Sequence, residues 1–206
     1  KGVTEAAFNR QIALRAKLDE EFTGRFGKGQ RSVRAYNEMF NSAVNLMSSR
    51  DLEAFDLSKE PQEAHALYGA EKFSKGVLLA RRLVEHGARF VEVQYGGFDW
   101  HSDAFTQADE KLPVLDQAYA ALLHDLEIKG LLESTLVVIA TEFGRTPKID
   151  DDGGRNHFPK AFSFVLAGAG VKGGIVHGET DETASNIVSE KTSVADFNAT
   201  IAVLDF

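Results

Sequence analysis

The sequence predicts an α/β fold, with a mostly parallel sheet that carries helices on both faces. From about residue 71 onward, amphipathic segments with helical spacing alternate with short, continuously apolar segments typical of buried parallel strands. The 206 residues are 43% hydrophobic and include only 4 Pro, which suits a globular domain with a substantial core. We therefore expect one α/β domain, with residues 1–70 as a helical lead-in or cap and residues 71–206 as the core.

The lead-in is expected to contain three helices. Apolar side chains recur at helical spacing over residues 6–22, and again from Ser32, a candidate N-cap, to Met47. A shorter helix is predicted to begin near Pro61 and to stop at Gly69, because Pro suits the first turn of a helix and Gly its end.

The core is expected to alternate helices and strands. Helical spacing predicts helices over residues 73–86, 112–130 and 193–204. Strands are predicted over 89–95, which ends at a glycine pair, over the continuously apolar run 135–141, and over 161–166. Gly87 and Gly130 mark helix ends, and Ser193 is a candidate N-cap.

Ligands of open α/β sheets bind at the carboxyl ends of the strands, so we expect catalytic or ligand-binding residues at these ends.

Charge and composition exclude several classes of function. The formal net charge of −8 argues against a nucleic-acid partner, because phosphate contacts need a basic surface. No apolar run approaches the roughly 18 residues of a membrane-spanning helix. With 0 Cys, a metal ion would have to bind His, Asp or Glu. The glycines of residues 168–173 match a dinucleotide motif, but no helix is predicted after them, which indicates a turn.

The first candidate segment, Gly96–Asp103, follows the predicted strand 89–95. Asp99, His101 and Asp103 offer two carboxylates and an imidazole on a glycine-hinged loop, a set that suits a divalent metal. The alternative is that Ser102 or Asp103 caps the following helix and that His101 is a solvated neighbour.

The second candidate segment, Thr141–Pro147, follows the most apolar predicted strand. Glu142 at the end of a buried strand must be solvated, paired or bound to a metal, because burying a lone carboxylate is costly. Arg145 would be its ion-pair partner or, alternatively, a fork that binds phosphate or sulfate.

The third candidate segment, Gly153–Pro159, carries Arg155, Asn156 and His157 just before the predicted strand 161–166. A lone His is more often structural than a metal ligand. The flanking glycines and proline, however, suit a segment that holds an unusual backbone course, which favours a functional role for His157.

Taken together, these segments resemble the bacterial family known as domain of unknown function 1501. The resemblance rests on Ala54–Pro61, Leu79–Gly87, Gly97–His101, Glu142–Pro147 and Gly154–Pro159. It implies that the chain is the C-terminal portion of a larger domain. It also implies export, because many members begin with a twin-arginine signal.

That family is in turn similar to the alkaline phosphatase superfamily, which includes sulfatases. The resemblance implies an alkaline-phosphatase-like fold and a divalent ion (Zn, Mn, Mg or Ca) held by Asp99, His101 and His157, with Glu142 as a further ligand. It implies that Arg145, Arg155 and Asn156 bind an anion. The spacing Asp99-x-His101, and Phe143 in the place of a second histidine, favour one metal over two.

The resemblance therefore implies a metal-dependent hydrolase of small phosphate or sulfate esters, whose nucleophile lies in sequence preceding Lys1. The alternative is a non-catalytic exported protein of the same fold that binds a ligand or partner. We expect Asp99, His101 and His157 to converge, with Glu142 at the same sheet edge. Nothing in the sequence indicates an oligomeric state.

Overall fold

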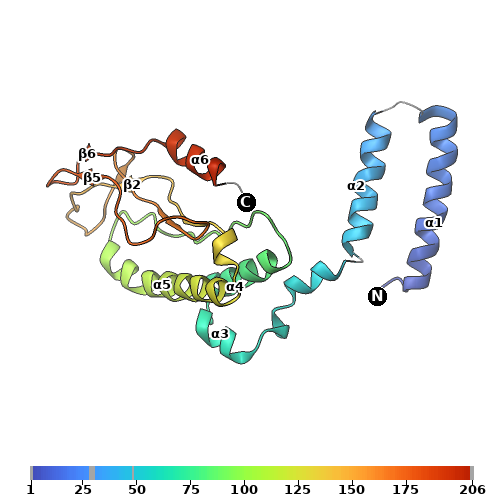
Figure 1. The fold of residues 1–206 in the computed structure, drawn as a ribbon, viewed down its shortest axis with the longest axis horizontal. Helices are drawn as coiled ribbons and strands as arrows, with labels where there is room; N and C mark the ends of the chain where they lie inside the picture. Colours follow the sequence, from blue (N-terminus) through green and yellow to red (C-terminus); the bar gives the residue numbers. More distant parts are fainter. Residues whose placement is uncertain (1, 28–30, 48, 205–206) are drawn as a thin grey trace. The chain divides into compact units, whose positions relative to one another are not determined.

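The chain is divided between two units, residues 1–53 and residues 54–206. The structure is a computed structural model that describes residues 2–27, 31–47 and 49–204. Figure 1 shows the helices and strands of each unit. The two units are described separately below.

The described part of residues 1–53 contains two α-helices. Helix α1 (Glu5–Phe22) begins at the N-cap Thr4, whose hydroxyl accepts a hydrogen bond from the amide of Ala7 (3.3 Å). A π-helical turn, Thr23–Gly27, follows α1, and α2 spans Arg31–Met47. The guanidinium of Arg15 covers the ring of Phe40 and donates to the side chain of Asn37 (3.1 Å), so α1 contacts α2. Both helices predicted from apolar spacing are confirmed, but α2 begins at Arg31, so Ser32, the predicted N-cap, lies within the helix.

Residues 54–206 contain four α-helices among the described residues: α3 (Gln62–Tyr68), α4 (Lys72–Glu85), α5 (Ala104–Ile128) and α6 (Val194–Val203). Short 3₁₀ turns lie at Arg50–Phe55, Leu57–Lys59 and Leu132–Ser134. Gly69 (φ 101°) and Gly87 (φ 84°) end α3 and α4 in the left-handed region, as the sequence predicted. Ser193 and Asp196 form a capping box at the start of α6.

The core of this second unit is helical. Tyr68 of α3, Leu78 of α4 and Ala118 of α5 are fully or almost fully buried against one another. The extended segment that follows α4 packs on this core through Val93, and Tyr95 stacks on Phe73 with ring centroids 4.1 Å apart. No described helix is both long and apolar enough to cross a membrane.

A buried ionic network joins the segment before α3 to α4 and α5. Arg81, only 2% exposed, pairs with Glu60 and Glu85, and its Nε lies 3.2 Å from a carboxylate oxygen of Asp125. The hydroxyl of Tyr68 donates to Asp125 (3.1 Å). These charges are compensated within the protein, so the network is structural.

Three two-stranded antiparallel pairs supply the β-structure of the described residues. Strand β1 (Val137–Ile139) pairs with β4 (Val165–Ala167), β2 (Gly144–Arg145) with β3 (His157–Phe158), and β5 (Glu179–Thr180) with β6 (Ile187–Ser189). In the view of Figure 1, these strands and α6 lie to one side of α5.

The predicted mostly parallel, alkaline-phosphatase-like sheet with helices on both faces is wrong. A parallel pair needs a long crossover connection, usually a helix, and the described residues between β1 and β4 contain only turns and the β2–β3 pair. The predicted strand 89–95 carries no β-ladder in the structure. Its side chains contact α4, and this contact accounts for the apolar pattern that predicted a buried strand.

Candidate metal centre

Three stretches of chain meet around the candidate residues, and main-chain atoms join them. The loop at Ser102 forms a bridge with Gly153, and the amide of Arg155 donates to the carbonyl of Trp100 (3.0 Å). In the β2–β3 pair, Arg145 lies opposite His157. The first and third candidate segments are thereby held beside the second.

Gly154 allows this close approach. A Cβ atom at Gly154 would lie 1.8 Å from the carbonyl oxygen of His101, and one at Gly144 would lie 2.2 Å from the carbonyl oxygen of Ala161. Any side chain at either position would push two backbones apart. The absence of a Cβ, rather than a positive φ, is what Gly154 contributes to the site.

Asp99, His101 and His157 converge, each offering one ligand atom within 4.8 Å of the others. Nε2 of His157 lies 2.8 Å from Oδ1 of Asp99, and Nε2 of His101 lies 3.0 Å from the same oxygen. The side chains are 62%, 49% and 49% exposed, respectively, so the group is open to solvent on one side.

Arg145 contacts the same carboxylate. Its guanidinium donates to Oδ1 of Asp99 at 2.5 Å and to the carbonyl of Arg155 at 3.3 Å. The hydrogen bond from His157, followed by that from Arg145, lowers the pKa of Asp99 from 3.8 to about 2. Asp99 is therefore ionised throughout the physiological range and available as a ligand.

The other two residues expected to bind an anion contact the protein itself. Arg155 donates through Nε to the carbonyl of Thr146 (2.6 Å), so its guanidinium braces the β2–β3 pair. The side chain of Asn156 contacts Nδ1 of His101 (3.1 Å) and a carboxylate oxygen of Asp150 (2.6 Å).

Glu142 is exposed and lies outside the group, in the connection between β1 and β2. The ring of its neighbour Phe143 packs against the imidazole of His157 in a tilted arrangement, with ring centroids 4.5 Å apart. A ring on one face of His157 restricts its rotation and helps to fix the direction of Nε2.

The alternative interpretation, in which Asp103 caps the helix that follows, is only partly consistent with the structure. Asp103 occupies the N-cap position of α5 with a φ of 48°, but its side chain makes no cap hydrogen bond. His101 contacts Asp99 and Asn156 and is therefore more than a solvated neighbour of a cap.

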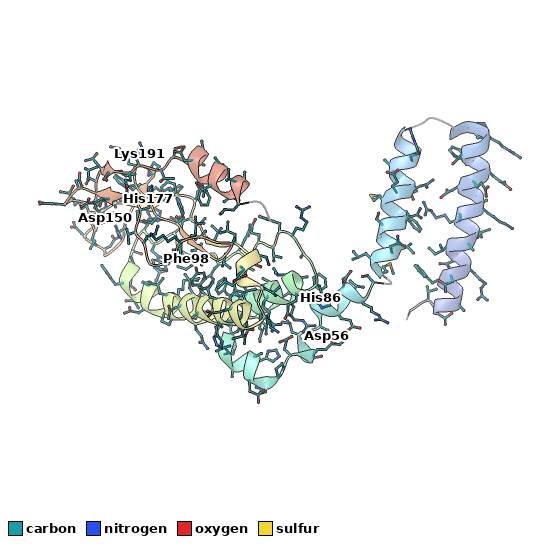
Figure 2. All side chains as sticks on the ribbon, in the orientation of Figure 1. Asp56, His86, Phe98, Asp150, His177 and Lys191 are labelled. Carbon is teal, nitrogen blue, oxygen red and sulfur yellow. The ribbon has the colours of Figure 1, made fainter. Side chains whose placement is uncertain are left out.

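Asp150 also belongs to the surroundings of the group, although the sequence analysis does not single it out. Figure 2 shows Asp150 near the β-pairs, far from Asp56 and His86 at the other end of the second unit. Only the hairpin register, which brings Asp150 next to Asn156, distinguishes it from Asp151 and Asp152. No local signal in the sequence marks that register.

The fold and the site define a mainly helical protein with an exposed Asp–His–His group on a loop and a short hairpin. A family model described as "Protein of unknown function (DUF1501)" matches residues 1–204, so the chain belongs to the DUF1501 family. Searches among curated proteins and among solved structures gave no significant match.

Proposed function

We propose that Asp99, His101 and His157 form a site for one divalent metal ion. The observation that carries this proposal is the convergence of their three ligand atoms within 4.8 Å. One carboxylate and two imidazoles form a mixed oxygen–nitrogen donor set, which suits Zn²⁺ or Mn²⁺ better than Mg²⁺ or Ca²⁺, since the last two prefer oxygen ligands.

The exposure of the group supports a catalytic rather than a purely structural site. Structural zinc sites are closed by four protein ligands, whereas catalytic ones use three and leave a position open for water or substrate. Here, three side chains from two stretches of chain face one another, and each is about half exposed. An open side gives a small ester access to the ion.

The reaction we propose is hydrolysis of a small phosphate or sulfate ester. When bound, a divalent ion would supply Lewis-acid stabilisation and lower the pKa of a coordinated water. Arg145, already beside Asp99, supplies a planar guanidinium that suits the oxygens of such an anion. The order of the motifs around Asp99, Glu142 and His157 is similar to that of the alkaline phosphatase superfamily, and this similarity supports the same reaction class.

A second candidate function is metal or ligand binding without catalysis. One observation favours it: the guanidinium groups of Arg145 and Arg155 both bond to oxygens of the protein itself. An anionic ester would have to compete with these contacts. Export by the twin-arginine route is a further proposal, which rests on the family resemblance alone.

The test compares full-length wild type, His157→Ala and His124→Ala proteins for bound metal after dialysis, and for hydrolysis of p-nitrophenyl phosphate and sulfate. His124 is exposed on α5 and serves as the matched control. We expect His157→Ala to lower metal affinity by at least about 10-fold and His124→Ala to leave it unchanged. Equal metal content in all three proteins would exclude the site. Metal binding without turnover of either ester would favour the second candidate.

A further inference from the structure

We propose that Asn156, oriented by Asp150, is a positioning residue that fixes the tautomer of His101 and directs its Nε2 lone pair toward the metal position. This inference rests on the proposed metal site. It assigns to Asn156 a role different from the anion binding expected from the sequence.

The orientation of the Asn156 amide is determined by its two neighbours. Its Nδ2 lies 2.6 Å from Oδ2 of Asp150, and a carboxylate can only accept a hydrogen bond. The amide nitrogen must therefore face Asp150. Oδ1 is left to face Nδ1 of His101, at 3.1 Å.

This orientation dictates where His101 carries its proton. Because Oδ1 of Asn156 is an acceptor, Nδ1 of His101 must be the donor. In a neutral imidazole, Nε2 then carries the lone pair. That nitrogen lies 3.0 Å from Oδ1 of Asp99. This oxygen already accepts hydrogen bonds from His157 (2.8 Å) and Arg145 (2.5 Å), so it does not require a third proton from His101. A divalent ion beside the two atoms would be attracted to both the carboxylate and the lone pair.

The backbone of Asn156 is also held in place, so the amide is a rigid support. Its N–H donates to the hydroxyl of Thr146 (3.0 Å), and its carbonyl accepts from the amide of Thr146 (2.9 Å). The loop that carries Asp150 is closed by the amide of Asp150 donating to the carbonyl of Gly154 (2.9 Å). A histidine ligand that donates through its other nitrogen to a fixed acceptor is oriented and made more basic.

The test first measures the His101 tautomer without metal, by nitrogen NMR of the imidazole at about pH 8.5, roughly two units above the ordinary pKa of histidine. We expect the Nδ1–H form in wild type and a shift toward Nε2–H in Asn156→Leu, which keeps the size of the side chain but has no acceptor. Zn²⁺ affinity should then fall by about 10- to 100-fold.

Two further variants separate positioning from simple loss of structure. The double variant Asp150→Asn/Asn156→Asp exchanges donor and acceptor, so both hydrogen bonds can form again, and it should restore the Nδ1–H form and most of the Zn²⁺ affinity. Asn186→Leu breaks an equivalent Asn–Asp hydrogen bond (2.7 Å, to Asp181) in the β5–β6 turn and should change neither quantity.

A wild-type His101 in the Nε2–H form, an unchanged tautomer in Asn156→Leu, or failure of the double variant to restore it would overturn the inference. Failure of Zn²⁺ to bind wild type would instead remove the proposed function. The tautomer measurement would still decide the role of Asn156, because it is made on the metal-free protein.

Discussion

Nε2 of His157 lies 2.8 Å from Oδ1 of Asp99, although the two residues are 58 positions apart in the sequence. His157 belongs to β3, and Asp99 lies in the loop that precedes α5. Their contact joins the hairpin to the loop and defines the candidate metal centre. Because of this contact, the unfolding free energy of the protein should depend on whether the Asp99 carboxyl is ionised.

The pH dependence of stability should report the ionisation of Asp99. Its pKa is lowered to about 2 in the folded protein, chiefly by the hydrogen bond from His157, so its contribution is present above the unfolded-state pKa, near 3.8. This contribution is lost as the pH falls through the folded pKa. We expect the difference in unfolding free energy between wild type and Asp99→Asn to shrink as the pH falls below 4. A difference independent of pH would show that Asp99 is not held as an anion.

Glu142 and Asp99 should differ as metal ligands. Asp99 belongs to the converging group and Glu142 does not. We therefore expect Asp99→Asn to lower Zn²⁺ affinity by at least about 10-fold and Glu142→Gln to change it by less than about 2-fold. Calorimetric titration of both variants measures this directly. An equal loss of Zn²⁺ affinity in the two variants would mean that Glu142 is also a metal ligand.

Gly154→Ala should disrupt the site through the backbone. The new Cβ would meet the carbonyl oxygen of His101 at 1.8 Å, so the loop and the hairpin would have to separate. Overpacking of this kind typically costs about 1–3 kcal/mol, and the change should also weaken Zn²⁺ binding. Gly173→Ala is the control, since its Cβ would meet no atom within 4 Å. Equal stability of the two variants in urea would contradict the close approach.

Arg81→Met should strongly destabilise the second unit. Removing the guanidinium would leave Asp125 buried without its cationic partner and Glu60 paired with Arg82 alone, and breaking a buried ion pair typically costs about 3–5 kcal/mol. Arg89→Met, on an exposed residue just after α4, should cost less than about 0.5 kcal/mol. Fluorescence of Trp100, the single Trp, follows unfolding of this unit. A loss below about 1 kcal/mol for Arg81→Met would show that the network contributes little.

The helices were predictable because their signals are local. Helical spacing, the Gly69 and Gly87 stops and the Ser193 cap all act within a few residues of the helix they define. Strand pairing is not local. A short apolar run such as Val137–Ile139 is compatible with a parallel or an antiparallel partner, and nothing within the run indicates which.

The residues of the candidate site also fall into two groups, those marked by a local pattern in the sequence and those whose roles depend on the three-dimensional structure. The sequence pointed to Asp99, His101 and His157 because carboxylates and imidazoles near glycines stand out as a local pattern. The roles of Asp150 and Asn156 depend on the register of a hairpin and on the direction of one amide group. Those are three-dimensional quantities, so composition and spacing could not supply them.

Main-chain hydrogen bonds contribute to the joint between the loop and the hairpin beside the side-chain contacts, and this bears on how the site can evolve. The carbonyl of Asp152 accepts from the amide of Asp103, and that of Gly153 accepts from the amide of Ala104. The exposed side chains of Asp151 and Asp152 are therefore available for variation. A library randomised at these two codons can alter the charge of this turn while the backbone keeps its course.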